Sequence, residues 1–247
     1  MTSKIISFSI LLPFFIGSYS AKAQDSLVNH AKPLKMIEIE IWSDVMCPFC
    51  YIGKRKIETA LERFEHKDMV KLIWKSYLLD PGLVSDSTKS IHQHLAESKG
   101  WASDYAKEMG KHVSAMAKEE GLQYNMDQVK VANTFDAHRL IQLAKQKNRG
   151  DEMEELLFRA YFTEGKNLAD PEVLKAIASQ IGIENEEVET MLRGKGYAKE
   201  VLEDLKAAED IGVSGVPFFV FNRNFAVSGA QPSETFLKAL KKAWENE

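Results

Sequence analysis

The arrangement of strand-type patterns constrains the fold of this chain most, because these patterns occur in two regions far apart. Met36–Trp42 alternates apolar and acidic residues, which is typical of a half-buried strand, and Val70–Tyr77 has a second strand pattern. Near the C-terminus, the apolar run Pro217–Phe221 and the segment Phe225–Ser228 flank a turn at 222–224. Apolar residues between the two regions recur at helical spacing. If the four strands form one sheet, a long helical segment is therefore inserted between its two halves.

The segments between the strands predict how the strands pair. A helix that begins near Pro48 joins the first two strands, and a strand–helix–strand unit implies parallel pairing. The short turn between the last two strands implies antiparallel pairing, and Pro232–Trp244 follows as an amphipathic helix. We therefore predict an α/β fold in which helices flank a mixed central sheet, with a large inserted helical subdomain. The predicted boundaries are 36–84 for the first half of the sheet domain, 85–195 for the insertion and 196–247 for the second half.

Apolar spacing also predicts individual helices in the insertion. Val131, Phe135 and Ile141 recur as one face of a helix. Asp170-Pro171 predicts the start of another helix, because aspartate caps a helix N-terminus and proline suits the first helical position.

The first residues of the chain resemble an export signal. Lys4 precedes the apolar run 5–16, and the small-x-small triplet Ala21–Ala23 follows at the distance that signal peptidase requires. The apolar run is shorter than the ~20 residues that span a bilayer. We expect residues 1–23 to be a signal peptide cleaved after Ala23, with an uncleaved anchor as the alternative, and residues 24–35 to be a linker. This predicts a periplasmic or otherwise exported protein.

Charge and cysteine content narrow the class of protein. The net charge is −4, and such a mildly acidic balance argues against nucleic acid as the partner, since phosphate binding requires clustered lysine and arginine. The chain has two cysteines, Cys47 and Cys50. A disulfide between them would close a very short loop, so it would stabilise the fold little. A purely structural role for the pair is therefore physically unfavourable.

The position of the cysteine pair favours redox chemistry. Cys47 would lie at the N-terminus of the helix, where unpaired N–H groups and the helix dipole favour the thiolate that attacks disulfides. Cys50, one turn further on, would lie on the buried side of the helix. Lys54, Arg55 and Lys56 would add positive charge nearby. The alternatives are zinc binding and inert burial, but structural zinc takes four ligands and the six histidines show no matching arrangement. We predict no metal and no cofactor.

A second motif lies far downstream, where Val216-Pro217 leads into the apolar strand. Proline at the start of a strand removes a donor from the hydrogen-bond ladder, so it belongs at a special position. Taken alone, this proline would be interpreted as an ordinary trans proline at a sheet edge.

Together these motifs resemble the thioredoxin superfamily, specifically its DsbA-like branch with a helical insertion. Cys47-Pro48-Phe49-Cys50, with Ser43-Asp44 before it and Tyr51-Ile52-Gly53 after it, is similar to the FrnE-type subgroup. The resemblance implies a thioredoxin fold in which Cys47 is the nucleophile and Cys50 is the resolving cysteine. It also implies that the Val216–Pro217 bond is cis and lies opposite the cysteines. Pro48, Phe49, Val216 and Pro217 would bind substrate.

The resemblance extends into the insertion and leaves some roles open. Asn133-Thr134 and Ala137-His138-Arg139 are similar to a segment of the subgroup's insertion, although we favour a packing role for these residues. Asp44 either tunes the cysteine pair or shapes its loop. The sequence does not decide the roles of Asp44, Asn133 and His138.

Phe49 and the export signal depart from the family pattern. DsbA has histidine at the position of Phe49, and the absence of that histidine here argues against strong oxidising power. FrnE-type proteins usually lack an export signal. The predicted function is to form, reduce or isomerise disulfides in exported proteins. We expect a monomer with a membrane redox partner. The alternatives are a glutathione-dependent isomerase or kappa-type transferase, and a peptide-binding chaperone that does not use the cysteines.

Overall fold

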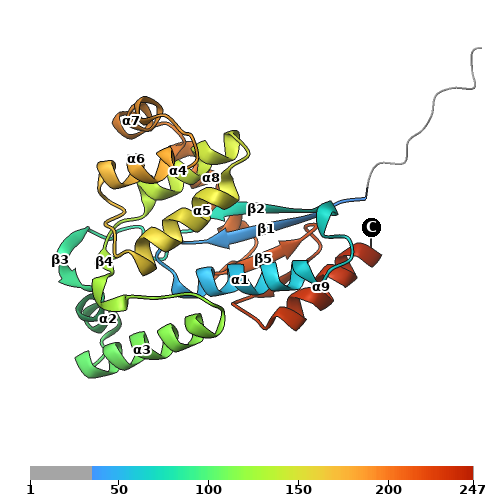
Figure 1. Ribbon diagram of the computed structural model, residues 1–247, viewed down its shortest axis with the longest axis horizontal. Helices are drawn as coiled ribbons and strands as arrows, with labels where there is room; N and C mark the ends of the chain where they lie inside the picture. The colour runs from blue at the N-terminus through green and yellow to red at the C-terminus, as the bar shows by residue number, and fades with distance from the viewer. Residues whose placement is uncertain (1–34, 247) are drawn as a thin grey trace, which may run out of the picture. The chain divides into compact units, whose positions relative to one another are not determined.

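A four-stranded mixed sheet organises the protein, whose computed structural model describes residues 35–246 (Figure 1). The strand order is β2-β1-β5-β6. Strands β1 and β2 are parallel, whereas β5 is antiparallel to both β1 and β6, which confirms the predicted mixed sheet. The strands are β1 (Ile37–Ser43), β2 (Val70–Ser76), β5 (Phe218–Phe221) and β6 (Phe225–Ser228). The predicted signal peptide, residues 1–23, and all of the linker except Lys35 lie outside the described residues.

Helices α1 (Pro48–Glu62) and α9 (Ser233–Glu245) lie side by side along the sheet (Figure 1). Their apolar faces enter the main hydrophobic core together with β1, where Ile39, Ile57 and Phe236 are each fully buried. The buried face of β1, which its period-2 pattern predicts, and the apolar face of α1, which its helical period predicts, therefore pack in one core.

Helix α8 (Ala198–Asp210) contacts β2 and packs on the other side of β1. The buried side chain of Trp42 shares a separate apolar cluster with Ala208, and the Trp42 indole Nε1 donates a hydrogen bond to the Asp204 carbonyl oxygen at 2.9 Å. Because Trp42 points away from the core that Ile39 and Ile41 enter, β1 is covered on both faces.

The chain between β2 and β5 is mainly helical, as predicted. Its helices are α2 (Ile91–Lys99), α3 (Ser103–Glu119), α4 (Phe135–Gln146), α5 (Gly150–Phe158), α6 (Pro171–Ser179) and α7 (Asn185–Arg193), followed by α8. A 3₁₀ turn, η2 (Met126–Gln128), and a π-helical turn, η3 (Arg159–Thr163), which extends α5, also lie in this segment, whereas a 3₁₀ turn at η1 (Lys67–Met69) precedes β2. The Asp170 side chain accepts a hydrogen bond from Glu172 N at 2.9 Å, which confirms the predicted cap of α6. The described residues form one compact unit, and the predicted boundaries at 84/85 and 195/196 stay a prediction.

One part of the insertion differs from the prediction. Strands β3 (Asp86–Ser90) and β4 (Lys130–Val131) form a separate two-stranded antiparallel sheet. Val131 therefore lies on a strand, and the helix predicted to include it starts at Phe135. The sequence of β3, Asp-Ser-Thr-Lys-Ser, has no apolar alternation, so its strand geometry comes from pairing with β4 rather than from a local pattern.

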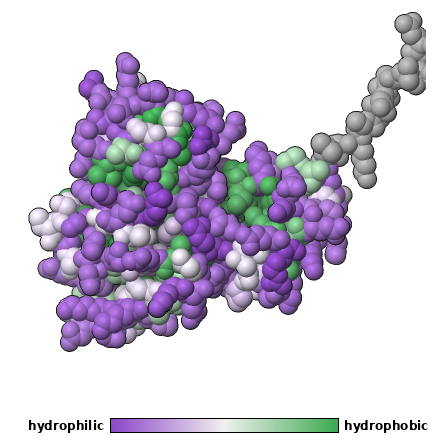
Figure 2. Space-filling model, in the orientation of Figure 1, coloured by the Kyte–Doolittle hydropathy of each residue, from purple (hydrophilic) through white to green (hydrophobic). Residues whose placement is uncertain are grey.

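The surface in Figure 2 is mainly hydrophilic, and apolar side chains gather over β1 and β2 and over α6. Within residues 35–246, no helix is long and apolar enough to cross a membrane.

Candidate active site

Cys47 lies at the N-terminus of α1, as predicted. It is the N-cap residue, with φ −86° and ψ 112°, and Pro48 occupies the first helical turn. The Cys47 amide donates to the Asp44 carbonyl oxygen at 2.9 Å, and the Cys50 amide donates to the Cys47 carbonyl oxygen at 3.0 Å. These bonds form a tight turn that places Cys47 where the helix N-terminus favours an anion.

The two thiols lie in different environments. Cys50 is fully buried, and this burial, followed by the effect of the adjacent Cys47, raises the pKa of Cys50 well above its ordinary value. Cys47 is only 4% exposed, but its side chain borders a cavity that is partly open to solvent. Cys47 is therefore the more accessible of the two thiols.

The loop before β5 packs directly against the cysteine pair. The Val216–Pro217 bond is cis, which confirms the prediction, and the Cys47 thiol donates a hydrogen bond to the Val216 carbonyl oxygen at 3.6 Å. Gly53 of α1 allows this approach, because a Cβ atom there would lie 2.9 Å from the Pro217 ring. Two motifs about 170 residues apart in the sequence thus form one site.

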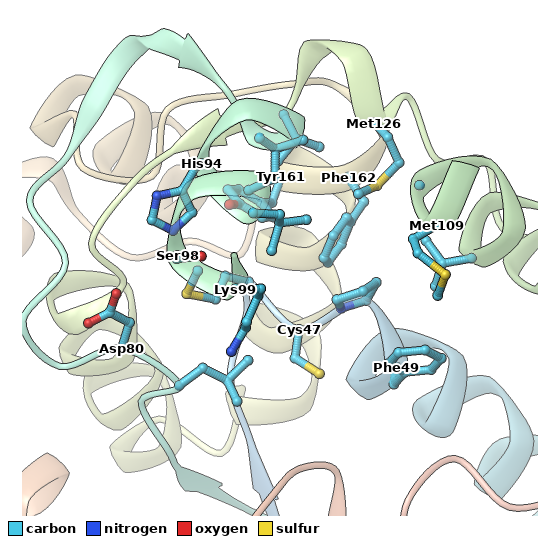
Figure 3. A pocket seen from close by; sticks show the side chains of 18 of the residues that line it. Cys47, Phe49, Asp80, His94, Ser98, Lys99, Met109, Met126, Tyr161 and Phe162 are labelled. Carbon is cyan, nitrogen blue, oxygen red and sulfur yellow. The ribbon is translucent and has the colours of Figure 1, made fainter. Parts of the chain in front are cut away.

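A cavity of about 500 Å³ adjoins this site (Figure 3). Cys47, Phe49 and Val216 border one end, and Met109 of α3 and Phe162 of η3 line the apolar interior. Polar side chains in its lining are Asp80, His94, Ser98 and Lys99. The insertion therefore supplies most of an apolar chamber, and the Cys47 side chain lies at one end of it.

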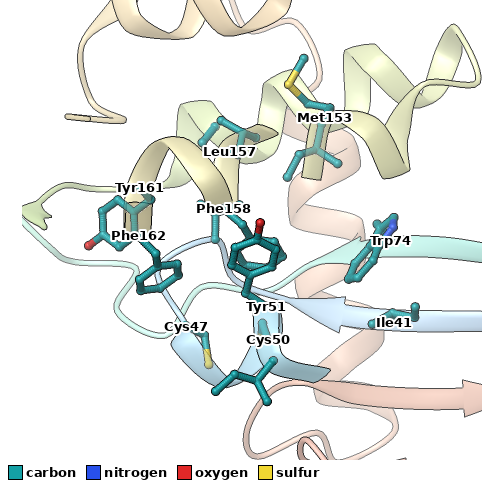
Figure 4. Close-up of a cluster of buried hydrophobic side chains, with 14 of the residues drawn as sticks. Ile41, Cys47, Cys50, Tyr51, Trp74, Met153, Leu157, Phe158, Tyr161 and Phe162 are labelled. Carbon is teal, nitrogen blue, oxygen red and sulfur yellow. The ribbon is translucent and has the colours of Figure 1, made fainter. Parts of the chain in front are cut away.

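Stacked aromatic rings fix the insertion against α1 (Figure 4). The Tyr51 ring of α1 stacks on those of Phe158 and Tyr124, with ring centroids 4.8 Å and 6.1 Å away. The Tyr124 hydroxyl also donates a hydrogen bond to the Pro48 carbonyl oxygen at 2.7 Å. Such stacking favours a fixed position of the insertion beside the cysteines. No sequence pattern predicts a role for Tyr124, because this residue lies on no periodic apolar run.

Asp44, whose role the sequence left open, shapes the loop before Cys47. It is fully buried, and its Oδ1 accepts hydrogen bonds from Thr134 Oγ1 at 2.9 Å and Met46 N at 3.2 Å, and contacts His138 Nε2 at 3.3 Å. Its Oδ2 accepts a hydrogen bond from Leu79 N at 2.8 Å. Asp44 therefore links the active-site loop to α4 and to the segment after β2.

Asn133 and Arg139 have structural contacts, as we favoured. The Asn133 side chain accepts from Phe135 N at 2.9 Å and donates to the Leu83 carbonyl oxygen at 2.9 Å. Arg139 donates to backbone carbonyl oxygens near the end of α7, including that of Gly194 at 2.9 Å. These bonds hold α4 in place rather than contact the cysteines.

The predicted contribution of Lys54, Arg55 and Lys56 to the charge around Cys47 is wrong. Lys54 is buried and pairs with Asp151 at 3.4 Å, and Lys56 pairs with Glu120 at 3.9 Å. Further carboxylates neutralise the first two cations: Glu58 and Glu155 each pair with both Lys54 and Arg55. These three cations are therefore paired with carboxylates and add little net positive charge beside Cys47.

Two buried polar residues lie near the pair in roles that the sequence did not predict. Glu154 of α5 and Ser43 at the end of β1 are each 1% exposed, and Ser43 Oγ donates a hydrogen bond to Glu154 Oε1 at 2.7 Å. Among residues 35–246, no group of three or more histidine, cysteine, aspartate or glutamate side chains could hold a metal ion.

Comparison with known proteins agrees with this geometry. Residues 38–241 match the family described as "DSBA-like thioredoxin domain". The "Uncharacterized protein YwbO" of Bacillus subtilis (strain 168) is 27% identical over 212 residues, which cover 83% of this chain and 96% of that protein.

Solved structures show the same fold. The probable DsbA oxidoreductase SCO1869 from Streptomyces coelicolor is similar with a TM-score of 0.81 and 36% identity, covering 85% of this chain and 91% of that one. The cytosolic disulfide reductase DsbM from Pseudomonas aeruginosa has a TM-score of 0.61 at 14% identity, covering 85% of this chain and 100% of that one, and shares the fold alone.

Proposed function

Because this chain belongs to the DSBA-like thioredoxin domain family, we propose that it is an exported thiol–disulfide oxidoreductase that forms, reduces or isomerises disulfides in proteins. One observation carries the proposal. The Cys47 sulfur lies at a helix N-terminus, 3.6 Å from the carbonyl oxygen that precedes the cis-proline, and borders an open apolar cavity. This arrangement exposes one thiol to substrates and leaves the second, Cys50, to resolve the intermediate.

The reaction proceeds through a mixed disulfide at Cys47. In the oxidising direction, a substrate thiolate attacks the Cys47 sulfur of the enzyme disulfide, and Cys50 leaves as a thiolate. A second substrate thiolate then attacks the substrate sulfur of the mixed disulfide and releases reduced enzyme. The reducing direction is the reverse. Since Cys50 is fully buried, the substrate bond forms at Cys47.

Substrate recognition combines backbone pairing with an apolar contact. An extended peptide segment pairs with the backbone at Val216-Pro217, while Pro48 and the 38% exposed ring of Phe49 border its other side. The cavity of about 500 Å³ beside Cys47 is large enough for a bulky apolar side chain near the reacting cysteine. Unfolded or partly folded proteins expose such side chains, so they fit the site better than native surfaces do.

The predicted export signal in residues 1–23 supports substrates in the cell envelope, where disulfides persist. A catalyst there requires a redox partner to restore its active state, and we propose a membrane protein for this role and a monomeric enzyme. Sequencing of the protein from the envelope fraction should give an N-terminus at Gln24. Full-length protein in the cytoplasm would contradict export.

The experiment that tests the activity uses an unfolded peptide with two cysteines and no glutathione. The oxidised protein should convert the reduced peptide to its disulfide, and the reduced protein should reverse the reaction under a reducing buffer. Cys47→Ser should abolish both reactions. Full turnover by Cys47→Ser, or turnover that starts only when glutathione is added, would contradict the proposal, and the second result would favour the glutathione-dependent class.

A further inference from the structure

The cavity beside Cys47 has a polar wall that comes from one helix. Five residues of α2 line the cavity at the spacing of a single helix face: Ile91, His94, Leu95, Ser98 and Lys99. The last turns of this face are polar, whereas a helix face that only packs against a core is apolar. Figure 3 shows His94 and Lys99 across the view from Met109, which lines the apolar part. Packing therefore does not explain the polar wall, which consists of His94, Ser98 and Lys99.

The side chains of the polar wall are free to bind a group that enters the cavity. Within residues 35–246, none of the three takes part in a side-chain hydrogen bond or an ion pair. Each can donate through an N–H or O–H group. Glu97, on the same helix, lies outside the cavity lining and pairs with Lys89. Asp80 also lines the cavity, but it forms no ion pair with Lys99 in this part of the chain. The wall therefore combines unused donors with the positive charge of Lys99.

We propose that the polar wall binds the carboxylate of an aspartate or glutamate that lies close to the reacting cysteine of a substrate protein. The inference rests on the proposed function and deepens it by naming a class of substrate. A carboxylate accepts hydrogen bonds through both oxygens and carries the charge that complements Lys99. Ser98 and Lys99 are exposed and His94 is half-buried, so an incoming side chain can reach all three.

The size of the cavity limits how far the acid lies from the substrate cysteine. A sphere of the cavity volume, about 500 Å³, is about 10 Å across, which is the length of about three residues of extended chain. Cys47 lies at one end of the cavity, and the Lys99 side chain extends towards Cys47 in Figure 3. The acidic residue should therefore lie within about three residues of the cysteine that bonds to Cys47.

Two other effects of charge make different predictions. The net charge of the chain is −4, so the field of the whole protein weakly disfavours an acidic substrate, and a preference for acids has to come from local groups. Lys99 is also the last residue of α2, where a cation stabilises the helix through its dipole. This stabilisation does not depend on the charge of the substrate, so a comparison of substrates separates the two roles.

The experiment compares peptides that differ in one residue. A peptide with two cysteines carries Glu, Gln or Lys at one position within three residues of the first cysteine, and the oxidised protein oxidises each peptide without glutathione. The measured quantity is the ratio of kcat/KM for the Glu peptide to that for the Gln peptide. This ratio should be about two- to fivefold higher in the wild type than in Lys99→Gln, as expected for a partly exposed ion pair. Any effect of Glu on the peptide thiol itself is the same for both proteins and cancels.

Two variants control for charge and for folding. Lys107→Gln removes the same charge from an exposed position on α3 that lies outside the cavity lining, so its ratio should equal that of the wild type. Lys99→Arg keeps the charge and should keep the ratio. High salt should lower the ratio in the wild type more than in Lys99→Gln, because salt screens an exposed ion pair.

Equal ratios in the wild type and in Lys99→Gln would overturn the inference, and so would an equal decrease in Lys107→Gln, which would indicate an effect of net charge. If Lys99→Gln fails to fold, the wild type decides, since oxidation of the Lys peptide at least as fast as the Glu peptide excludes an acid-binding wall. Failure to oxidise any of the three peptides would instead refute the proposed function, so the two failures are distinguishable.

Discussion

Replacing Glu154 with glutamine should change how the stability of the protein depends on pH. Burial raises the pKa of the Glu154 carboxyl from 4.5 to about 7 in the folded protein. The unfolded chain exposes this group, which then ionises near its ordinary value. Between these two values the folded state retains a proton that the unfolded state has lost. The contribution of Glu154 to the free energy of unfolding is therefore fully present below about pH 4.5, and it is lost as the pH rises to about 7.

The magnitude follows from the shift. Each pKa unit corresponds to about 1.4 kcal/mol, so the interval from 4.5 to about 7 corresponds to about 3 kcal/mol of stability. Glu154→Gln lacks the ionisation but retains an acceptor for Ser43. Relative to the wild type, the variant should gain about 3 kcal/mol in its free energy of unfolding between pH 4.5 and 7.5.

Urea unfolding of both proteins measures this difference at half-unit pH intervals. Both should be kept reduced so that the state of Cys47 and Cys50 is the same throughout. The two curves of unfolding free energy against pH should diverge between pH 4.5 and 7 and run parallel above. Curves that stay parallel over the whole range would refute the argument that burial holds Glu154 protonated.

Three further predictions concern the cysteine pair and its contacts. We expect a wild-type redox potential on the order of −150 to −240 mV. Phe49→His should raise this potential, because a histidine can stabilise the thiolate of the reduced form. Equilibration with glutathione buffers measures the potential, and no upward shift in the variant would contradict the reasoning. Gly53→Ala should lower the free energy of unfolding, measured in urea, by about 1–3 kcal/mol, because the new Cβ would lie 2.9 Å from the Pro217 ring. An unchanged urea midpoint would show that the neighbouring atoms shift to accommodate the new methyl group without cost. Brief alkylation at mildly acidic pH should modify Cys47 and spare the fully buried Cys50, as peptide mapping would detect, whereas equal labelling would contradict the assignment of roles.

The sheet and the cysteine turn could be predicted from the sequence because their signals are local. The alternation in Met36–Trp42 reports a strand with a buried face, and proline after Cys47 reports the first turn of a helix. The structure places the strand at β1 with each end shifted by one residue, and α1 begins at Pro48 as predicted. The cis bond at Pro217 was predicted from family resemblance, since no local pattern distinguishes it from a trans bond.

The β3–β4 pairing could not be predicted, because it depends on tertiary contacts. Strand β4 has two residues, too few to show a period, and β3 is entirely polar. Both become strands only because the fold brings them together.

The burial and pairing of the charged residues around the site could also not be predicted from the sequence. Glu152, Glu154 and Glu155 are close together in the sequence, yet Glu154 is buried, Glu155 pairs with Arg55, and Glu152 faces solvent. Likewise, the sequence could not show that Lys54 is buried among carboxylates. Burial of a charged residue depends on how helices from distant parts of the chain pack, and no short-range pattern reports it.

The central claim is that Cys47 exchanges disulfides with proteins and Cys50 resolves the intermediate. The most direct test traps that intermediate with Cys50→Ser and an unfolded, disulfide-containing protein, and then maps the linkage by mass spectrometry. The account predicts a covalent complex in which a substrate cysteine is bonded to Cys47, absent when Cys47→Ser is used instead. A complex that forms equally well with Cys47→Ser, or no complex with Cys50→Ser, would contradict it.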